Sequence, residues 1–303
     1  MKKLIALLLV ALLALTCTAC AEAYTITASA PSGAPALALA TIAVNQPENF
    51  TFVAAETISA EFASAKADFI VAPVNAGAKL YKMGKSTYKL AGVVSWGNLY
   101  IASQKKNFQL EDMNGAKVVL FGENTINAAV VNYALEKNGI VPTSVEYLAG
   151  AAQTQALLLT DKEAIVVTAE PALTAAKMKN AAITAYAVND LYKAATGYEG
   201  YTQAALFVKA ETIENRPEDV KAFIEAVAAS CGLATTDVAA VADAAVALEI
   251  LPNVKVATQA IPGCAVRFVN ANDAREQIEF TANIDLSQFG GALPADDFYY
   301  AAE

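Results

Sequence analysis

The pattern of apolar and polar positions predicts strands that alternate with helices over the first third of the chain. Short apolar runs predict strands at Tyr24–Ala28, Thr51–Ala54, Asp68–Ala72 and Tyr88–Ser95. Between them, the spacing predicts a loop over Ser29–Pro35 and helices from about Ala36, over Thr57–Ala67 and over Asn75–Lys82. This alternation is typical of parallel βαβ units.

The same pattern starts again after a polar stretch at residues 104–114. Lys117–Phe121 is predicted as a strand, and Ile126–Asn138 as a helix closed by Gly139. A further strand is expected at Ala204–Lys209, before a long helix that opens at about Pro217. If the chain returns there to its first unit, lobe 1 comprises residues 21–103 and 206–303, and lobe 2 comprises residues 104–205.

Two pairs of segments suggest that the lobes are similar. Asp68–Lys82 and Glu163–Lys177 align without gaps, 95 residues apart, and each runs from an acidic residue through an apolar strand to an alanine-rich helix. Ser32–Ala34 and Glu123–Thr125 correspond at an offset of 91 residues. The alternative is that any two βαβ segments look alike. A real correspondence predicts two hinge crossings and one cleft, lined by loops at the carboxyl ends of the strands.

The first twenty residues, MKKLIALLLVALLALTCTAC, have the pattern of a secretory signal. Twelve apolar residues, Leu4–Leu15, are too few to span a bilayer core of about 30 Å as a permanent helix. Thr18 and Ala19 precede Cys20, as in bacterial lipoprotein signals, whose cysteine is acylated. We therefore expect residues 1–20 to be a signal peptide, with lipidation at Cys20. A redox or metal pair of Cys17 and Cys20 is disfavoured inside a signal peptide.

Composition restricts the chemistry. The chain has no histidine, which excludes Ser-His-Asp and Cys-His catalysis and the common zinc sites. The net charge of −9 becomes −11 without Lys2 and Lys3, and the only arginines are Arg216, Arg267 and Arg275, which argues against a nucleic-acid partner. With no credible catalytic set, we expect no enzyme, no cofactor and no metal.

Two cysteines, Cys231 and Cys264, remain after the signal. In an exported protein they can form a disulfide, and two separately buried thiols are an equally weighted alternative. The sequence leaves both open.

Two loops carry groups suited to hydrogen-bond acceptors. In Pro31–Pro35, Gly33 allows close approach of the backbone. Free N–H groups, the positive end of the helix dipole and the Ser32 hydroxyl predict an acceptor-binding pocket there. Asn124 and Thr125 offer the same chemistry in the second lobe. Ordinary N-capping is the alternative for each loop.

Trp96, Glu123 and Glu170 each have two interpretations. Trp96 is the only tryptophan and ends a strand beside Gly97, where it is either a ligand platform or a core residue. The two glutamates lie at predicted helix N-termini, where capping alone explains carboxylates. If they line the cleft, they favour an amine or a ring N–H over a bare anion. The four loops contain no arginine, which also disfavours a simple oxyanion.

Several strings resemble substrate-binding lipoproteins of bacterial ABC importers, of the nitrate, sulfonate, taurine and thiamine-pyrimidine-precursor group. They are APSGAPALA (30–38), APVNAGAKLY (72–81), SWGNLY (95–100), EPALT (170–174) and GGALPADDFYY (290–300). The resemblance implies an α/β, two-lobed periplasmic-binding-protein type II fold, with mainly parallel sheets flanked by helices. It also implies that the lobes close on a small solute and deliver it to membrane permease subunits.

The resemblance implies a set of ligand contacts, to which we add Ala34, Gly97 and Gln203. The set is Ser32, Gly33, Ala34, Asn75, Trp96, Gly97, Asn124, Thr125, Glu170 and Gln203. We expect a monomer, anchored by lipid on the outer face of the cell membrane or in the periplasm. The expected solute is amine-bearing, heteroaromatic or sulfonate-like. The alternatives are an enzyme of pyrimidine or menaquinone precursor metabolism on the same fold, and a surface sensor lipoprotein that hands nothing to a permease.

Overall fold

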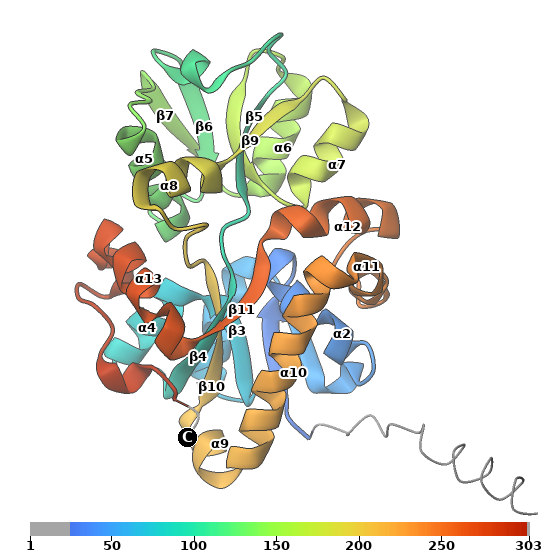
Figure 1. Ribbon diagram of the computed structural model, residues 1–303, viewed down its shortest axis with the longest axis vertical. Coiled ribbons are helices and arrows are strands. Elements are labelled where there is room, and N and C mark those ends of the chain that lie inside the picture. Colours follow the sequence, from blue (N-terminus) through green and yellow to red (C-terminus); the bar gives the residue numbers. More distant parts are fainter. Residues whose placement is uncertain (1–24, 302–303) are drawn as a thin grey trace, which may run out of the picture.

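The computed structural model describes residues 25–301, which form two lobes, each built on its own β-sheet (Figure 1). The signal peptide and Cys20 lie outside the described residues. The first sheet has the order β11-β4-β10-β3-β1-β2. Its strands are β1 (Ala28–Pro31), β2 (Phe50–Val53), β3 (Phe69–Pro73), β4 (Tyr88–Ser95), β10 (Ala204–Lys209) and β11 (Val266–Asn270). The second sheet has the order β7-β6-β8-β5-β9. Its strands are β5 (Leu99–Ser103), β6 (Lys117–Phe121), β7 (Ser144–Leu148), β8 (Ile165–Ala169) and β9 (Thr184–Ala187).

Helices cover both faces of each sheet. Those of the first lobe are α2 (Ala40–Ala43), α3 (Ile58–Ser64), α4 (Val74–Lys82), α9 (Ala210–Asn215), α10 (Pro217–Thr236), α11 (Val238–Ala247), α12 (Val254–Ala260) and α13 (Ala271–Ile284). Those of the second lobe are α5 (Ile126–Lys137), α6 (Ala151–Thr160), α7 (Ala172–Lys179) and α8 (Val188–Thr196). Three short 3₁₀ helices also matter for the site: η1 (Ala34–Ala38), η5 (Ile261–Cys264) and η6 (Leu286–Phe289).

Both sheets are mixed, whereas the sequence predicted mainly parallel sheets. Strands β1, β2 and β3 are parallel neighbours, but β10 is antiparallel to both β3 and β4. In the second sheet, β5 is antiparallel to β8 and β9. The cause is the double crossing between the lobes. Strands β5 and β10 each begin where the chain enters a lobe, so they run against strands that end there.

The two sheets have the same internal order, which confirms the expected correspondence between the lobes. Read from the edge, β2-β1-β3-β10-β4 matches β7-β6-β8-β5-β9. Strand β3 with α4 therefore corresponds to β8 with α7, as the alignment of Asp68–Lys82 with Glu163–Lys177 predicted. Asn75 and Glu170 are equivalent positions in this alignment.

The cores follow from the alternation of side chains along the strands. In β3, Phe69 and Val71 pack on one face of the sheet, and Ile70 and Ala72 on the other. Because both faces of a central strand are buried, the strand is a continuous apolar run. Helices α2, α10 and α11 cover the first face, and α3, α4 and α13 cover the second. The core on the second face also includes residues of α5 and α8 in the other lobe, so one apolar core spans both lobes.

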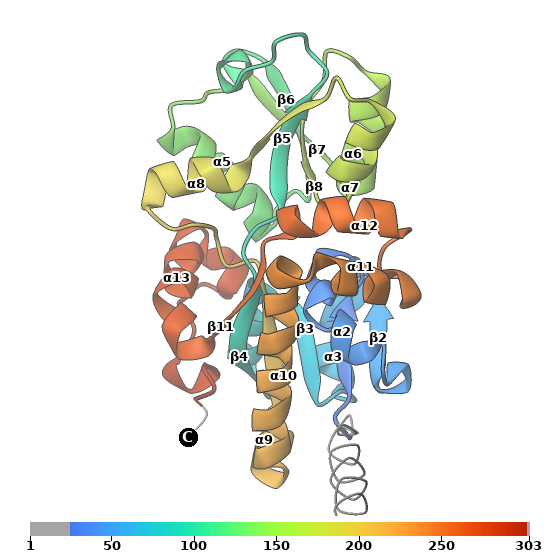
Figure 2. The same ribbon diagram turned by 45° about the vertical axis from the view of Figure 1, so that its right-hand side comes forward.

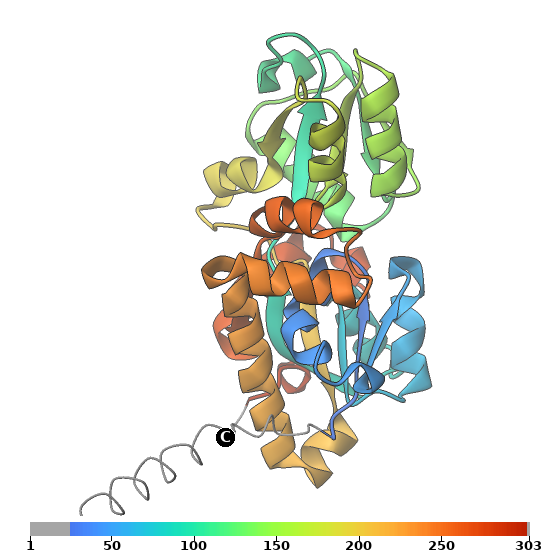
Figure 3. The same cartoon turned by 90° about the vertical axis from the view of Figure 1, so that its right-hand side faces the viewer.

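The lobes meet on two sides of the crossing segments. On one side, α12 and η5 of the first lobe lie against the second lobe, where the Tyr100 hydroxyl donates to the Gly263 carbonyl over 3.1 Å (Figures 2 and 3). On the other side, Phe280 of α13 packs against Tyr133 and Tyr192, with ring centroids 6.1 and 6.2 Å apart. These contacts hold the lobes close together.

Two expected boundaries differ from the structure. The first strand was predicted at Tyr24–Ala28, followed by a loop, but β1 runs over Ala28–Pro31. Its residues have weak strand preference, and pairing with β2 over its whole length decides its position. The crossings were expected near residues 103 and 206. Strand β5, Leu99–Ser103, hydrogen-bonds within the second sheet, so the first crossing covers residues 96–98. The expected limit at 103 therefore falls at the end of β5 in the second sheet, and the expected limit at 206 falls inside β10 of the first sheet.

Within residues 25–301, no single helix is long and apolar enough to cross a membrane. Only α10 and α11 taken together have the length and composition, and they are bent by 114° at their junction.

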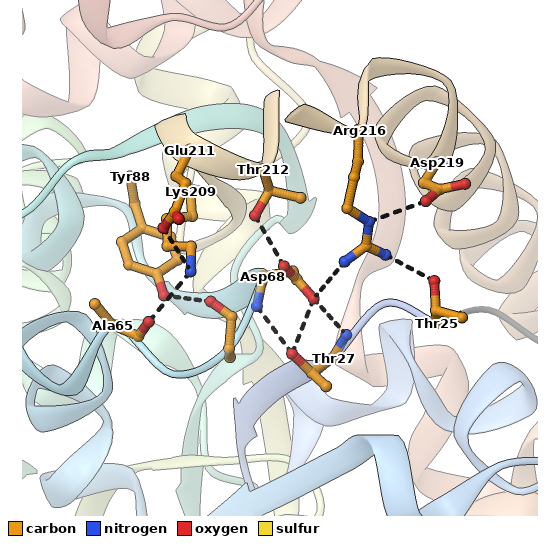
Figure 4. Close-up of polar contacts among 11 residues, drawn as sticks. Thr25, Thr27, Ala65, Asp68, Tyr88, Lys209, Glu211, Thr212, Arg216 and Asp219 are labelled. Atoms are coloured by element: carbon orange, nitrogen blue, oxygen red, sulfur yellow. Dashed lines mark hydrogen bonds and ion pairs between the residues drawn. The ribbon is translucent and has the colours of Figure 1, made fainter. Parts of the chain in front are cut away.

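A polar cluster around Asp68 fixes the start of the fold (Figure 4). It lies directly before β1 and β3, at the ends of these strands that are remote from the cavity-facing ends. The Asp68 carboxylate accepts hydrogen bonds from the Thr27 N–H (2.9 Å), the Thr27 hydroxyl (3.0 Å) and the Thr212 hydroxyl (2.8 Å). Arg216 lies 3.5 Å from the same carboxylate and donates to the Thr25 hydroxyl over 2.9 Å. One carboxylate therefore joins the segment before β1 to β3, α9 and α10.

We predict that Asp68→Ala lowers the free energy of unfolding by about 2–3 kcal/mol, because it leaves several part-buried donors without an acceptor. The matched control is Asp219→Ala, which removes an exposed partner of Arg216 and should cost about 0–1 kcal/mol. Urea unfolding followed by circular dichroism measures both. Equal losses for the two variants would contradict the assigned role of Asp68.

Candidate functional site

A cavity of about 270 Å³ lies between the lobes. The first lobe contributes residues from the ends of β1 and β3 and from η6, and the second lobe contributes the start of α5. The lining residues are Pro31, Ser32, Pro35, Ala55, Pro73, Asn75, Ala76, Thr125, Ile126, Asn127, Gln203, Ala204 and Gln288. This is the position expected for a ligand in open α/β sheets, beyond the carboxyl ends of the strands.

Three helices begin at this cavity. Gly33, with φ of 105°, turns the chain after β1 into η1, and α4 begins directly after Pro73. Thr125 caps α5, because its hydroxyl oxygen accepts from the Ala128 N–H over 3.3 Å. The first N–H groups of a helix have no partner inside it, and Ile126 and Asn127, the first two residues of α5, line the cavity. The twelve-residue helix α5 also adds the positive end of its dipole.

Gln203 connects the cavity to the crossing segments. Its side-chain oxygen accepts from the Ser95 hydroxyl over 2.9 Å, and its amide nitrogen donates to Asn98 over 2.9 Å. Asn98 in turn donates to the Glu170 carbonyl over 2.9 Å. Both polar atoms of the Gln203 side chain are therefore engaged by the protein, and the residue fixes the floor of the cavity.

Several polar groups of the lining keep capacity for a ligand. The Asn75 side-chain oxygen is buried and has no hydrogen-bond partner among the described residues. Asn127 accepts from the Tyr201 hydroxyl over 3.0 Å through its oxygen, which leaves its amide nitrogen as a donor. A buried acceptor without a partner costs free energy, and a bound solute that donates to Asn75 removes this cost.

The structure brings together part of the expected set of contact residues. Ser32, Asn75, Thr125 and Gln203 line the cavity. The remaining members are absent from its lining, and they are Gly33, Ala34, Trp96, Gly97, Asn124 and Glu170. Gly33 and Asn124, with φ of 105° and 57°, shape the turns that carry their neighbours into the lining.

Trp96 is held inside the crossing region, away from the cavity. Its side chain is 2% exposed, its indole N–H donates to the Arg267 carbonyl over 3.0 Å, and the Arg267 guanidinium lies 4.3 Å from the ring centroid. Of its two sequence interpretations, the geometry fits the core residue. Gly97, with φ of 87°, allows the chain to turn there, and Asn189 donates to its carbonyl over 2.9 Å.

Glu170 faces a different pocket, of about 390 Å³, beside Tyr100, Lys177 and Gly263. Its carboxylate accepts from the Thr174 N–H (3.1 Å) and hydroxyl (2.9 Å) and so caps α7. Burial raises the pKa of the Glu170 carboxyl, although the hydrogen bonds from Thr174 and the charge of Lys177 act in the opposite direction. Glu123 is exposed and absent from the cavity lining. The expected preference for an amine, which depended on these carboxylates in the cleft, therefore loses its basis.

Sequence reasoning missed Asn127 and Gln288. Asn127 lies in the first turn of the predicted helix after Thr125, so the rule that pointed to Thr125 could have included it. Gln288 belongs to η6, which reaches the cavity from the far end of the chain through contacts with α4. No local signal marks such a position.

The two cysteines are separate thiols. Cys231 and Cys264 are both buried and unbonded, and the Cys264 thiol donates to the Ala260 carbonyl over 3.3 Å. Burial raises the pKa of Cys231 to about 12 and also raises that of Cys264. This arrangement is the second of the two alternatives left open by the sequence, and both thiols are chemically quiet.

Two further findings help to locate the site. No group of three or more potential metal ligands occurs within residues 25–301. A larger pocket of about 530 Å³ lies beside α9, the start of α10 and Tyr299, and its walls come from the first lobe alone. The 270 Å³ cavity, like the 390 Å³ pocket at Glu170, has walls from both lobes, and of these three pockets it is the one lined by the starts of α4 and α5.

The chain matches one protein family in sequence and resembles several solved proteins in structure. The family described as NMT1/THI5 like matches residues 58–238. An ABC transporter protein from Parabacteroides distasonis has a TM-score of 0.79 at 21% identity, with 92% of this chain and all of that chain covered. The periplasmic aliphatic sulphonate binding protein SsuA from Escherichia coli has a TM-score of 0.70 at 14% identity, with 92% of each chain covered. The ligand binding component of an ABC-type import system from Staphylococcus aureus, solved with zinc bound, has a TM-score of 0.68 at 12% identity, over 91% of this chain and 96% of that chain. No curated protein shows significant sequence similarity to this chain. The neighbours confirm the two-lobed α/β binding-protein fold.

We predict that Gly200→Ala destabilises the protein by about 1–3 kcal/mol, because its methyl group would lie 2.2 Å from the Trp96 carbonyl oxygen, between the two crossing segments. The matched control is Gly232→Ala in α10, where a methyl group meets no atom within 4 Å. The control should be neutral or more stable by about 0.5–1 kcal/mol. Urea unfolding measures both, and a Gly200→Ala protein as stable as the control would refute close packing of the crossings.

Proposed function

We propose that this chain, which belongs to the NMT1/THI5-like family, is the extracytoplasmic solute-binding component of an ABC importer. One observation carries the proposal: a small cavity whose walls come from two lobes joined by two adjacent crossings. The structural neighbours described as ABC transporter or ABC import proteins support this role. The cargo is a small organic solute, and the partners are the permease subunits in the membrane.

Closure of the lobes supplies the mechanism. In the open protein, a solute could touch the Ser32 and Asn75 side of the first lobe or the Thr125 and Asn127 side of the second lobe, but not both. Only the closed protein offers the two sets of contacts at once, so the solute shifts the population towards closure. The crossing segments act as the hinge. Gln203, at the floor of the cavity, contacts the solute. A permease can then distinguish loaded from empty protein by the placement of the two lobes.

We also propose that Cys20 carries a lipid anchor and that the protein works as a monomer outside the cytoplasmic membrane. Strand β1 begins at the Asp68 cluster and ends beside Ser32 at the cavity. A tether attached before β1 therefore reaches the end of the first lobe remote from the cavity, and it leaves the cleft free for solute and permease.

The function test uses one variant from each lobe. We expect natively purified protein, or protein offered a broad solute library, to bind a small molecule detectable by native mass spectrometry. A solute at 100 to 1,000 times its Kd should stabilise the fold by about 3–4 kcal/mol. Asn75→Ala and Asn127→Ala should each weaken binding at least tenfold, because the solute bridges the lobes. Glu170→Gln is the control and should bind normally. A protein that binds no solute, or binds one equally well in all variants, would refute this function.

For the anchor, we predict that Cys20→Ala shifts the protein from the membrane fraction to the soluble fraction of cells that process lipoproteins. Cys17→Ala is the control and should leave the protein in the membrane fraction. Fractionation with metabolic labelling by a fatty-acid analogue measures both. Loss of label in Cys17→Ala alone would place the anchor at the other cysteine.

A further inference from the structure

The cavity between the lobes is lined entirely by uncharged residues. Its polar side chains are amides and hydroxyls, from Ser32, Asn75, Thr125, Asn127, Gln203 and Gln288. Glu170 faces the second pocket, and Arg267 stacks on Trp96. No ionisable side chain among the described residues lines the cavity.

A charged solute would therefore meet no side chain of opposite charge in the cavity. Moving a charged solute from water into a closed cavity costs several kcal/mol unless an opposite charge or a complete set of hydrogen bonds replaces the lost hydration. Two of the six polar side chains are already engaged: Gln203 through both polar atoms, and Thr125 by accepting from Ala128 and donating to the Gly122 carbonyl over 2.6 Å. An anion in the cavity would therefore depend on the helix N-termini and the remaining amide and hydroxyl donors alone, and a cation on the amide and hydroxyl oxygens alone.

The remaining groups are also complementary in type. The buried Asn75 oxygen needs a donor. Across the cavity, the amide nitrogen of Asn127 and the first N–H groups of α5 need acceptors. A solute that satisfies both walls carries a donor at one end and an acceptor at the other.

We propose, building on the function above, that the solute is a small uncharged molecule with an N–H or O–H donor and a carbonyl-type acceptor, of the amide, ureide or lactam kind. Its donor binds the Asn75 oxygen of the first lobe, and its acceptor binds the first turn of α5 in the second lobe. The cavity volume of about 270 Å³ lies just below the usual range for drug-sized ligands, so the solute is small. Selection follows from this pairing: a sulfonate satisfies the α5 wall but leaves Asn75 without a donor.

The test compares two panels of probes of similar size by thermal shift at equal ionic strength. One panel contains uncharged amides, ureides and lactams, and the other contains sulfonates, carboxylates and alkylammonium salts. We expect stabilisation only by members of the uncharged panel. The affinity of the best member should be constant from about pH 5 to pH 9, because no group in the cavity titrates in that range.

Two isosteric variants then identify the contact. Asn75→Asp keeps an acceptor oxygen at the same place, whereas Asn75→Leu removes it. For a donor-bearing uncharged probe, affinity should fall at least tenfold in Asn75→Leu and less in Asn75→Asp. For an anion, the order reverses, because the new carboxylate repels it. Glu170→Gln should leave all affinities unchanged.

The outcomes separate the two proposals. Stabilisation by sulfonates or carboxylates, with Asn75→Asp as the weakest binder, would overturn the uncharged class and keep the solute-binding function. Stabilisation by alkylammonium salts would do the same and assign a cationic cargo. If no probe stabilises the protein and native mass spectrometry shows no bound solute, the solute-binding function itself fails.

Discussion

The double crossing between the lobes is the constraint on which the rest of the structure depends. Two extended segments pass through the interior side by side, and their backbone groups must find partners there. The backbone N–H of Trp96 donates to the Ala265 carbonyl, and that of Gln203 donates to the Ser95 carbonyl. The backbone N–H of Glu170 donates to the Asn98 carbonyl. Asn189 completes the set by donating to the carbonyls of Trp96 and Gly97. These backbone groups of the crossing segments therefore have partners in this arrangement of the lobes, and the crossings connect the two halves of the cavity.

This constraint also explains the mixed sheets and the position of the cavity. A strand that leaves a crossing starts where its neighbours end, so β5 and β10 are necessarily antiparallel to β8 and β3. The same edge of each sheet carries the starts of the helices, which brings α4 and α5 to opposite walls. The cavity is thus a consequence of topology, and the side chains at these helix starts decide what it accepts.

The sequence predicted what local patterns control. Strands β3, β4, β6 and β10 and the start of α10 were predicted nearly to the residue, because central strands are continuous apolar runs and Pro217 marks a helix start. The cavity residues Ser32 and Thr125 follow from the rule that ligands bind beyond strand ends, and Asn75 was implied by the family resemblance. The strand Ala28–Pro31 was displaced because pairing with β2 outweighs its weak propensity, and Gln288 was missed because it arrives through tertiary contacts alone. Local sequence encodes neither the position of this strand nor the approach of Gln288 to the cavity.

The pseudo-symmetry of the lobes shows why equivalent positions need not share a role. Asn75 and Glu170 follow corresponding strands, yet Asn75 faces the cavity and Glu170 faces the pocket beside η5. The difference comes from what covers each strand end. Glycine at 263 lets η5 approach so closely that a methyl group there would lie 2.7 Å from the Tyr100 hydroxyl and 3.1 Å from the Glu170 side chain. Glu170, the one buried charged residue among the described residues, lies at this contact and is absent from the lining of the 270 Å³ cavity. The equivalent position in the first lobe is the uncharged Asn75, so the cavity that it lines contains no carboxylate.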